Sequence, residues 1–504
     1  MDLVIQLGPR RAKILGDLDR GLVDFLDDAT SAYVKNYQFS KLFRQKRKDG
    51  SRVWDGKKHL FSRTSNTFSV GVLDIVCDVL NRMKVKYSLD NAFLKEMCLP
   101  PHVEANWSGG WMIPDQAGPY TLYEYQKDSI REFLNPARTL PYRGLIKIGT
   151  GGGKTAIGAT IAKILGAKTI FLVHGKKLTR QNLDVFYRVF EGQEDLVGSI
   201  TSDDWSPSLV TVASSDTLYS RMKNVDYEDK VNELIDGTVL TIADECHRAT
   251  STTFEKVINL INSPMRLGLS GTPNKQEDDR DLLLHSLTGP ILYEMGVDQL
   301  KKEGTISKAH LLGVTVSSPK IDSLDWVEAF STLIVNNGYR HRVIAELIKE
   351  RHRSGKTILV LAGNSIALAD NIYQAVVGTL KDKVHLVNGV SKDEDVDNAF
   401  SLLQKKEISC VITTTIADEG IDIPAVNSLI LAGGGKSYVR TIQRVGRTLR
   451  LKEDGSAAEI VDILDKTNRY LKAHAKARLE HYEAEKLFDT CMVIKASTII
   501  GDNV

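Results

Sequence analysis

The sequence has few cysteines, and none of them is spaced as in a common metal site or disulfide framework. The five cysteines lie far apart, at positions 77, 98, 246, 410 and 491, and no two of them form a C-x-x-C pair. Zinc ribbons and disulfide-rich folds both need closely grouped cysteines, so this spacing argues against each of them. A reducing compartment is the simplest inference, and we expect the protein in the cytoplasm.

Long hydrophobic runs are also missing. No window reaches the roughly 18 consecutive apolar residues that a membrane-spanning helix needs. The first residues, Met1 to Gln6, lack the basic start and apolar run of a signal peptide. The sequence therefore predicts a chain that is neither secreted nor membrane-spanning.

An excess of charge of one sign is absent as well. The chain has 66 Lys and Arg against 64 Asp and Glu, a net charge of +2 over 504 residues. Any surface that binds nucleic acid must therefore come from local clustering of basic residues. The length predicts about three domains of 100 to 200 residues each.

One basic cluster lies in the N-terminal part, which we predict to be a small α/β domain over residues 1–117. Residues 52–61 read as a hairpin with an Asp-Gly turn, and residues 70–83 have helical spacing. The cluster consists of Lys41, Arg44, Lys46, Arg47, Lys48, Arg52, Lys57 and Lys58, with Phe43 and Trp54 among them. Such a mixture suits a nucleic-acid backbone and base faces, and a solvated hairpin with a core tryptophan is the open alternative.

A glycine-rich turn follows the apolar segment 145–148. It reads Gly149-Thr150-Gly151-Gly152-Gly153-Lys154-Thr155 and leads into helix-forming residues. Glycines let backbone N–H groups converge on a phosphate, and the next helix adds its positive N-terminal end. Lys154 would reach the β and γ phosphates of ATP, and Thr155 would bind Mg²⁺. The strict pattern has glycine where this chain has Ile148, so a plain strand-to-helix turn stays open for this stretch alone.

Apolar runs at 169–174, 209–213, 239–243 and 265–269 predict buried parallel strands of a doubly wound α/β domain over residues 118–303. Polar residues follow each run, where such sheets bind ligands: His174, Lys176 and Arg180; Ser214 to Thr217; Asp244, Glu245 and His247; Ser270 and Thr272. Asp244 would hold the water shell of Mg²⁺, and Glu245 would polarise the attacking water.

A second α/β domain is predicted over residues 304–504, after a charged, glycine-containing stretch at 293–307 that resembles a linker. Its apolar runs at 357–362, 384–387, 410–414 and 428–432 again predict buried parallel strands. Residues 467–485, rich in Lys, Arg, Ala and Glu, predict a solvent-exposed helix.

Between the last of these runs and that helix, residues 438–450 place several arginines on one helical face. Arg440, Arg444 and Arg447 follow at spacings of four and three, and Arg450 extends the row. Like charges on one face repel unless an anion lies opposite, and a triphosphate would supply it. A merely basic surface helix is the alternative.

Five segments, in their order and spacing, resemble the motifs of superfamily 2 helicases. They are the glycine-rich turn, Asp244-Glu245-Cys246-His247, Ser270-Gly271-Thr272, Thr414 with Gly420-Ile421-Asp422, and Gln443 to Arg450. The resemblance covers about residues 120–470 and implies two tandem RecA-like domains. The basic N-terminal domain makes the chain similar to the phage UvsW helicases, and more distantly to the XPB group.

This resemblance implies a DNA-remodelling ATPase that migrates junctions, reverses forks and dissociates R-loops. Gln126 would contact adenine, Asp422 beside Gly420 would approach the ribose, and Arg447 and Arg450 would be arginine fingers near Gln443. His247, Ser270 and Thr272 would couple hydrolysis to movement. The implied nucleic-acid contacts are His174, Lys176, Arg180, Ser214, Thr217, Gly363 and Thr414, with Arg44, Trp54 and Lys57 from the N-terminal cluster.

The expected cofactors are ATP and Mg²⁺, and the expected partner is single-stranded, forked or branched DNA, with RNA–DNA hybrid as a further candidate. We expect a monomer in the cytoplasm, that of the host cell if the chain is phage-encoded. Two other classes share the motifs: a translocase that moves on duplex DNA without separating strands, and a nucleotide-switched nucleic-acid sensor.

Overall fold

The computed structural model describes residues 2–34, 37–47, 49–90, 92, 111–138, 142–246, 252–271, 280–414, 426–435, 445–446, 448–449, 451–452 and 455–501. Side chains are described at all of these except Lys177, Thr252 and Arg280. The chain forms two compact units, residues 1–148 with 153–294 and residues 149–152 with 295–504. No helix in the described ranges is long and apolar enough to cross a bilayer.

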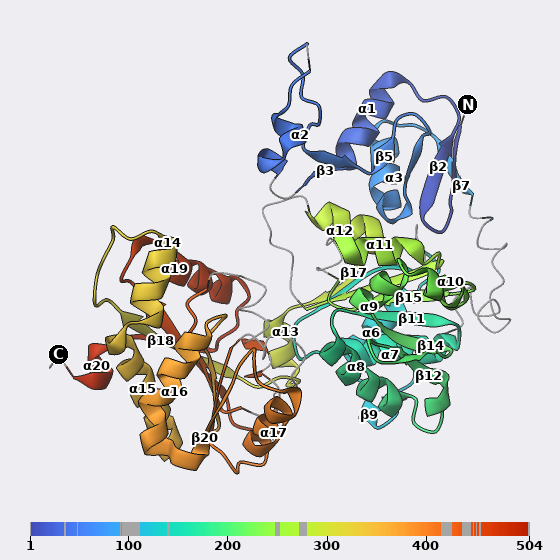
Figure 1. The fold of residues 1–504 in the computed structure, drawn as a ribbon. Helices are drawn as coiled ribbons and strands as arrows, with labels where there is room; N and C mark the ends of the chain where they lie inside the picture. The colour runs from blue at the N-terminus through green and yellow to red at the C-terminus, as the bar shows by residue number, and fades with distance from the viewer. Residues whose placement is uncertain are drawn as a thin grey trace. The chain divides into compact units, whose positions relative to one another are not determined.

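The N-terminal part of the first unit is a small α/β fold around its own core (Figure 1). Its five described strands pair in the order β5 (Phe61–Ser62), β6 (Thr67–Ser69), β2 (Arg11–Leu15), β1 (Leu3–Gln6) and β7 (Tyr87–Asp90). Helices α1 (Arg20–Ala29) and α3 (Leu73–Arg82) pack together. Exposed and buried residues alternate along β2, so one face of the strand packs on the core and the other faces solvent.

The helix predicted at 70–83 is confirmed as a 3₁₀ turn, Val70–Val72, followed by α3. The predicted hairpin at 52–61 is wrong. Strand β4 (Lys57–His59) pairs antiparallel with the distant β3 (Ser31–Tyr33), and Arg52 forms an isolated bridge with Lys46. Tertiary pairing thus overrides the local Asp-Gly turn signal.

The N-terminal fold is fastened to the rest of its unit at helix α12 (Arg280–Thr288). His285 Nε2 lies 2.9 Å from Asp74 Oδ1, and Ser69 Oγ donates to the Ser286 carbonyl at 2.6 Å. Gly71 has no side chain here, and a Cβ on it would lie 2.4 Å from that same carbonyl oxygen. The two parts therefore meet through direct polar contacts and close backbone packing.

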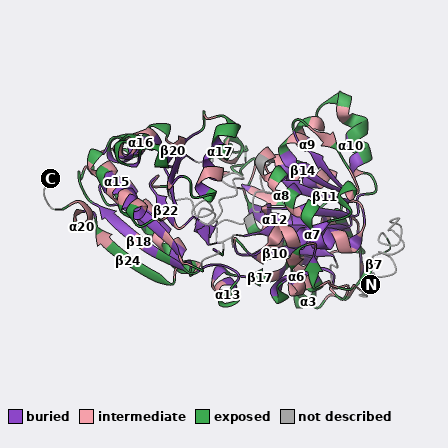
Figure 2. Cartoon of the chain, turned by 90° about the horizontal axis from the view of Figure 1, so that it is seen from below, coloured by how far each residue is buried: buried purple, intermediate pink, exposed green. Residues whose placement is uncertain are grey.

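The larger part of the first unit is a mainly parallel sheet with helices on both faces (Figure 1). Its eight described strands run in the order β13 (Trp205–Ser206), β12 (Val197–Ile200), β14 (Val210–Ser214), β11 (Thr169–Val173), β15 (Leu240–Ala243), β16 (Met265–Ser270), β10 (Arg143–Ile148) and β17 (Ile291–Met295). The helices are α6 (Glu124–Phe133), α7 (Lys154–Leu165), α8 (Lys176–Val189), α9 (Ser215–Arg221), α10 (Glu228–Ile235), α11 (Thr252–Leu260) and α12. The predicted apolar runs are confirmed as strands, and Figure 2 shows β11 and β14 as buried.

The second unit has its own parallel sheet. Its seven described strands run in the order β20 (Val384–Val387), β21 (Cys410–Thr413), β19 (Ile358–Leu361), β22 (Ser428–Leu431), β23 (Ala458–Asp465), β18 (Ala309–Val316) and β24 (Thr490–Lys495). Its helices include α13 (Val297–Lys302), α14 (Trp326–Phe330), α15 (Gly338–Arg353), α16 (Ile366–Leu380), α17 (Asp393–Gln404), α19 (Arg469–Ala484) and α20 (Ser497–Ile500). The predicted fold class, two doubly wound sheets after a small α/β domain, is confirmed.

Helix α19 confirms the helix predicted at 467–485, but one side of it is buried. Arg478 donates from Nε and Nη2 to the two carboxylate oxygens of Asp462, each at 2.9 Å, and the Tyr482 hydroxyl also donates to Asp462. The Arg478 and Asp462 side chains are only 5% and 0% exposed. A paired charge of this kind is costly to break, because removal of one member leaves the other buried and uncompensated.

We expect Asp462→Ala to lower the free energy of unfolding by about 3 to 5 kcal/mol, because Arg478 would lose its counter-ion. Denaturant unfolding of the full chain, followed by circular dichroism, measures this change. The matched control is Glu480→Ala on the same helix, whose partner Lys476 is 3.5 Å away at an exposed site. That change should cost less than about 1 kcal/mol. Equal effects of the two substitutions would contradict the assignment of Asp462.

Another ionic contact, which lies in the N-terminal fold, depends on pH. His59 places Nδ1 2.7 Å from Asp27 and Nε2 2.9 Å from Asp55, so only the protonated ring can donate to both carboxylates. Partial burial disfavours the charged ring, but hydrogen bonds and charges from Asp27 and Asp55 outweigh it and raise the pKa of His59. The contact joins β4 to helix α1.

Because the folded-state pKa is raised, this stabilisation is complete below the unfolded value of about 6.5 and is lost as the pH rises through the higher folded value. The ring is 41% exposed, so solvent screening limits the effect to less than about 1 kcal/mol. We expect His59→Gln to remove this part of the decline in melting temperature above about pH 6.5. An unchanged decline would refute the role given to His59.

Candidate nucleotide and nucleic-acid site

Several predicted site residues lie at, or directly follow, one edge of the sheet of the first unit. Strands β14, β11, β15, β16 and β10 are neighbours in this order, and each pairs in parallel with the next. Their carboxyl ends therefore share one edge, which carries Ser214, His174, Asp244, Ser270 and Gly149 in turn. Open α/β sheets bind ligands at this edge.

The glycine-rich loop has the backbone that a phosphate-binding turn needs. Gly151 and Gly153 have φ values of 88° and 74°, which side chains disfavour. Helix α7 begins directly afterwards at Lys154, so its N-terminal N–H groups face the loop. The Lys154 ammonium donates to the Ile148 carbonyl at 3.2 Å, which holds the amine at the loop.

Gln126 packs directly against this loop. It is only 6% exposed, and its Oε1 accepts a hydrogen bond from the Tyr123 backbone N–H at 3.0 Å. A Cβ on Gly153 would lie 2.4 Å from Gln126 Nε2, so the fourth loop glycine is needed for this contact. The helix that carries Gln126 therefore lies beside the predicted phosphate site. In the sequence, only the position of Gln126 ahead of the loop suggested this.

The acidic pair lies at the end of β15, two strands from the loop. Asp244 is 7% exposed, and its backbone N–H donates to the Leu172 carbonyl at 2.9 Å. Glu245 has φ +46°, which is uncommon for a residue with a side chain and clusters at functional sites. Cys246 is fully buried, and burial raises the pKa of its thiol well above the ordinary value. It is therefore a neutral core residue.

Sequence reasoning missed Asn182. The Thr155 hydroxyl donates to Asn182 Oδ1 at 2.8 Å, and Asn182 Nδ2 donates to the Leu178 carbonyl at 2.8 Å. The second bond fixes the amide so that its oxygen faces Thr155. The signal in the sequence was a polar residue one helical turn from Leu178 and from Phe186, on the buried side of α8.

The residues present fit a magnesium ion. Since Thr155 gives its proton to Asn182, its oxygen lone pairs remain available to a cation. Asp244 Oδ1 accepts a hydrogen bond from the Glu245 N–H at 3.0 Å, which holds the carboxylate at the strand end, and carboxylates are among the ligands that Mg²⁺ takes from proteins. Mg²⁺ takes most of its ligands from phosphate and water, so one hydroxyl and one carboxylate from the protein are enough.

We expect Asn182→Ala to weaken Mg²⁺-dependent nucleotide binding about threefold to tenfold, the effect of one lost hydrogen bond. The measurement is the affinity for a fluorescent ATP analogue over a range of Mg²⁺ concentrations. Asp184→Ala, an exposed change on the same helix, is the control. A purely structural role for Asn182 would lower the melting temperature without moving the Mg²⁺ dependence.

Residues predicted to bind nucleic acid in the first unit are partly engaged within the protein. His174 Nδ1 lies 3.3 Å from Asp216 Oδ2, and Lys176 pairs with Asp203. Arg180 is exposed. Ser214 is buried, and its hydroxyl caps helix α9 by accepting from the Thr217 N–H at 3.4 Å. A phosphate at this edge would compete with the two acids for His174 and Lys176.

In the second unit, Gly363 and Thr414 follow the neighbouring strands β19 and β21, so they share the carboxyl edge of that sheet. In the N-terminal fold, Arg44 is exposed. Trp54 Nε1 donates to the Lys57 carbonyl at 2.8 Å, and Lys57 Nζ lies 3.2 Å from Asp28, so both side chains have structural contacts. Seven predicted residues lie outside the described ranges: His247, Thr272, Gly420, Asp422, Gln443, Arg447 and Arg450.

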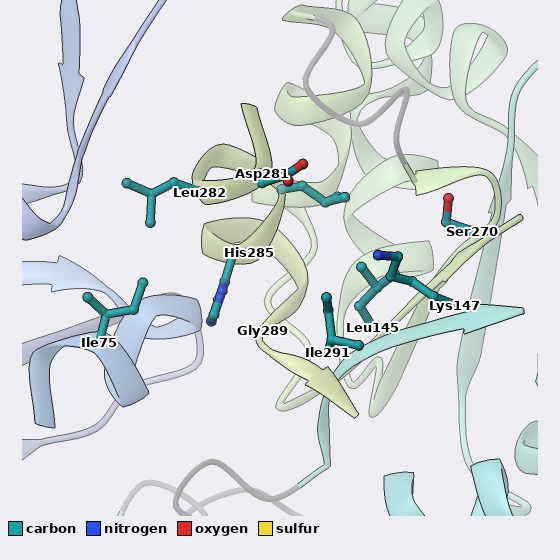
Figure 3. A pocket seen from close by; sticks show the side chains of 10 residues that line it. Ile75, Leu145, Lys147, Ser270, Asp281, Leu282, His285, Gly289 and Ile291 are labelled. Carbon is teal, nitrogen blue, oxygen red and sulfur yellow. The ribbon is translucent and has the colours of Figure 1, made fainter. Parts of the chain in front are cut away.

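A cavity of about 280 Å³ lies in the first unit, between helix α12, the end of β16 and helix α3 (Figure 3). Leu145, Leu282 and Ile291 make its lining mostly apolar, and Ser270 borders it on one side. Lys154 and Thr155 do not line it. The cavity is therefore distinct from the candidate phosphate site, and it joins Ile75 of the N-terminal fold to the strand tip at Ser270.

Two protein families match parts of the chain. The family described as "Type III restriction enzyme, res subunit" matches residues 119–275, and the "Helicase conserved C-terminal domain" matches residues 339–452. These ranges contain the glycine-rich loop and acidic pair in the first case, and the arginine-rich segment in the second.

Relatives with similar sequences match roughly 70% of this chain. "Putative helicase 22" of Sulfolobus islandicus filamentous virus is 25% identical over 383 residues, 71% of this chain and 66% of that protein. "DNA 3'-5' translocase XPB2" of Sulfurisphaera tokodaii is 25% identical over 378 residues, 68% of this chain and 82% of that protein. The chain thus aligns with about two thirds of the first relative.

Among solved structures, that of T4 UvsW covers 98% of this chain and 100% of its own, with 19% identity and a TM-score of 0.44.

Proposed function

Because the chain belongs to superfamily 2 of the ATP-dependent helicases and translocases, we propose that it is a DNA motor that remodels branched DNA. Its actions would be junction branch migration, fork reversal and R-loop dissociation, in replication, recombination and repair. The observation that carries the proposal is the shared sheet edge, where the glycine-rich loop, Asp244 and Ser270 lie beside the strand tips at His174 and Ser214.

The nucleotide half of the mechanism uses the first unit. Backbone N–H groups of the loop and of the first turn of α7 bind phosphate, and Lys154 binds the β and γ phosphates. Thr155 and Asp244 hold Mg²⁺, which neutralises charge on the phosphates when it is bound. Glu245 orients the attacking water and takes its proton. Gln126, already placed against Gly153, selects adenine.

The arginine-rich segment acts on the same triphosphate. Arg447 and Arg450 stabilise the negative charge that develops as the γ phosphate leaves. Gln443 belongs to the same catalytic set, and Gly420 and Asp422 contact the nucleotide. His247, Ser270 and Thr272 sense the γ phosphate. ATP binding then favours one arrangement of the two sheets and hydrolysis releases it, which is how a nucleotide cycle drives steps along a strand.

Contacts to nucleic acid are to the backbone. His174, Lys176, Arg180 and Thr217 in the first unit, with Gly363 and Thr414 in the second, follow strand ends that suit phosphate binding. Backbone contacts carry little sequence information and release counter-ions. Binding should therefore show weak sequence preference and fall steeply as salt rises.

The relative named as a DNA 3'-5' translocase favours a second candidate, a motor that moves on duplex without separating strands. Two assays with the same protein distinguish them: displacement of a strand from a forked or four-way junction, and displacement of a third strand from a triplex. Remodelling of the junction supports our proposal. Triplex displacement with intact junctions would replace it by the duplex translocase.

A further inference from the structure

A projecting arm of the N-terminal fold, formed by residues 37–47 and 49–54, has a fixed shape of its own (Figure 1, around α2, Lys41–Arg44). The ring of Tyr37 stacks on Tyr33 at 4.7 Å and meets Phe43 edge-on at 4.7 Å. The Arg52 guanidinium lies 3.6 Å from the centre of the Phe43 ring. A Cβ on Gly56 would lie 2.4 Å from the Tyr37 ring, so glycine is needed there. These contacts pack the arm's aromatic side chains against one another and against Arg52.

The arm exposes large apolar side chains that its own core does not use. Phe39 is 71% exposed and Leu42 is 53% exposed, three residues apart in sequence. A single exposed apolar residue is ordinary, but two so close together on a projecting, internally ordered element indicate a surface that another molecule covers. Neither side chain belongs to the N-terminal core cluster.

The charge of the arm shows which kind of molecule fits. Residues 37–54 contain six Lys or Arg and one acid, Asp49, a net charge of +5 in a chain whose total is +2. The five whose side chains are described, Lys41, Arg44, Lys46, Arg47 and Arg52, are exposed. Arg44 lies 5.7 Å from the centre of the Phe39 ring. A cation beside an exposed aromatic ring can bind a phosphate while the ring packs on the base.

We propose that Phe39 and Leu42 contact unstacked bases at the branch point of the DNA, while Lys41, Arg44 and Arg47 hold the flanking phosphates. This inference rests on the proposed function and adds the element that recognises the branch. An intact duplex hides its base faces by stacking, whereas a fork or junction exposes them. An apolar side chain therefore gains most at the branch, where little stacking has to be broken.

The test uses a double variant of the full chain that carries both Phe39→Ala and Leu42→Ala. The control variant is Val225→Ala. Val225 is 82% exposed on the loop between α9 and α10, so its change removes exposed apolar surface elsewhere. Affinity is measured for a fork and for linear single-stranded DNA, with 2-aminopurine placed at the branch or within the duplex. We expect the double variant to bind the fork at least about fivefold less tightly and to lose the fluorescence change at the branch only.

A second variant, Arg44→Ala with Arg47→Ala, separates the phosphate contacts. It should weaken binding to fork and linear DNA alike and reduce the salt slope by about two. ATPase activity stimulated by linear single-stranded DNA should survive in the Phe39 and Leu42 variant. If neither DNA stimulates ATPase even in the unaltered protein, the proposed function fails. If stimulation holds and the apolar variant keeps its preference for the fork and its fluorescence change, the arm surface binds something else, such as a protein, and the inference is overturned.

Discussion

We expect Lys154→Ala to lower ATP turnover by roughly a hundredfold or more, while binding to DNA is largely kept. The expected size follows from losing one fixed positive group where negative charge develops. Lys154 begins α7, and its ammonium lies at the glycine-rich loop, 3.2 Å from the Ile148 carbonyl. The DNA contacts are assigned to other residues, Arg180 and those of the N-terminal arm among them, so DNA affinity should change little. A coupled phosphate-release assay and fluorescence anisotropy measure the two quantities.

Lys163→Ala is the matched control for this experiment. Lys163 stands on the same helix, donates to the Val189 carbonyl at 2.6 Å and lies near Phe190, away from the loop. Its loss removes a lysine from α7 without removing the group assigned to phosphate. Turnover that survived in Lys154→Ala, or that fell equally in the control, would refute the assignment of the nucleotide site.

Arg447→Ala and Arg450→Ala are expected to lower turnover by about a thousandfold or more while nucleotide binding persists. Arginine fingers act on the charge of the transition state, so their removal affects the hydrolytic step far more than ground-state binding. The measurements are the hydrolysis rate at saturating DNA and the affinity for a fluorescent ATP analogue. The two quantities should separate clearly.

The control here is Arg353→Ala. Arg353 is an exposed arginine at the end of α15 in the same unit. It should leave hydrolysis unchanged. If the Arg447 and Arg450 variants also hydrolyse ATP at the normal rate, the arginine-rich segment is only basic and the arginine-finger assignment is wrong.

Strands were predictable where both faces are covered, because burial on both sides makes the sequence continuously apolar. Strands β11, β15 and β19 have such sequences. Strand β23 was not predicted, because Glu459, Asp462 and Asp465 interrupt its apolar residues. In the structure they pair with Arg351, Arg478 and Arg340 respectively, from helices distant in sequence. Nothing local in the sequence indicates such pairs.

The candidate site also has features that the sequence predicts and features that it does not. The glycine-rich loop, Asp244 and Ser270 could be predicted, because each directly follows an apolar strand and parallel strands end at one edge. The contact of Thr155 with Asn182 could not, since it joins two helices 27 residues apart through side chains. Trp54 and Lys57 were predicted to contact nucleic acid from their position in a basic cluster, but charge clustering does not reveal that Lys57 already pairs with Asp28.

The most direct test of the central claim is the ATP hydrolysis rate of the full chain with single-stranded, duplex, forked, four-way and RNA–DNA hybrid substrates. A DNA-remodelling motor should hydrolyse ATP slowly alone and faster with DNA, most strongly with the forked or four-way substrates. A slow rate that no nucleic acid changes would contradict the account and indicate a nucleotide-switched binding protein.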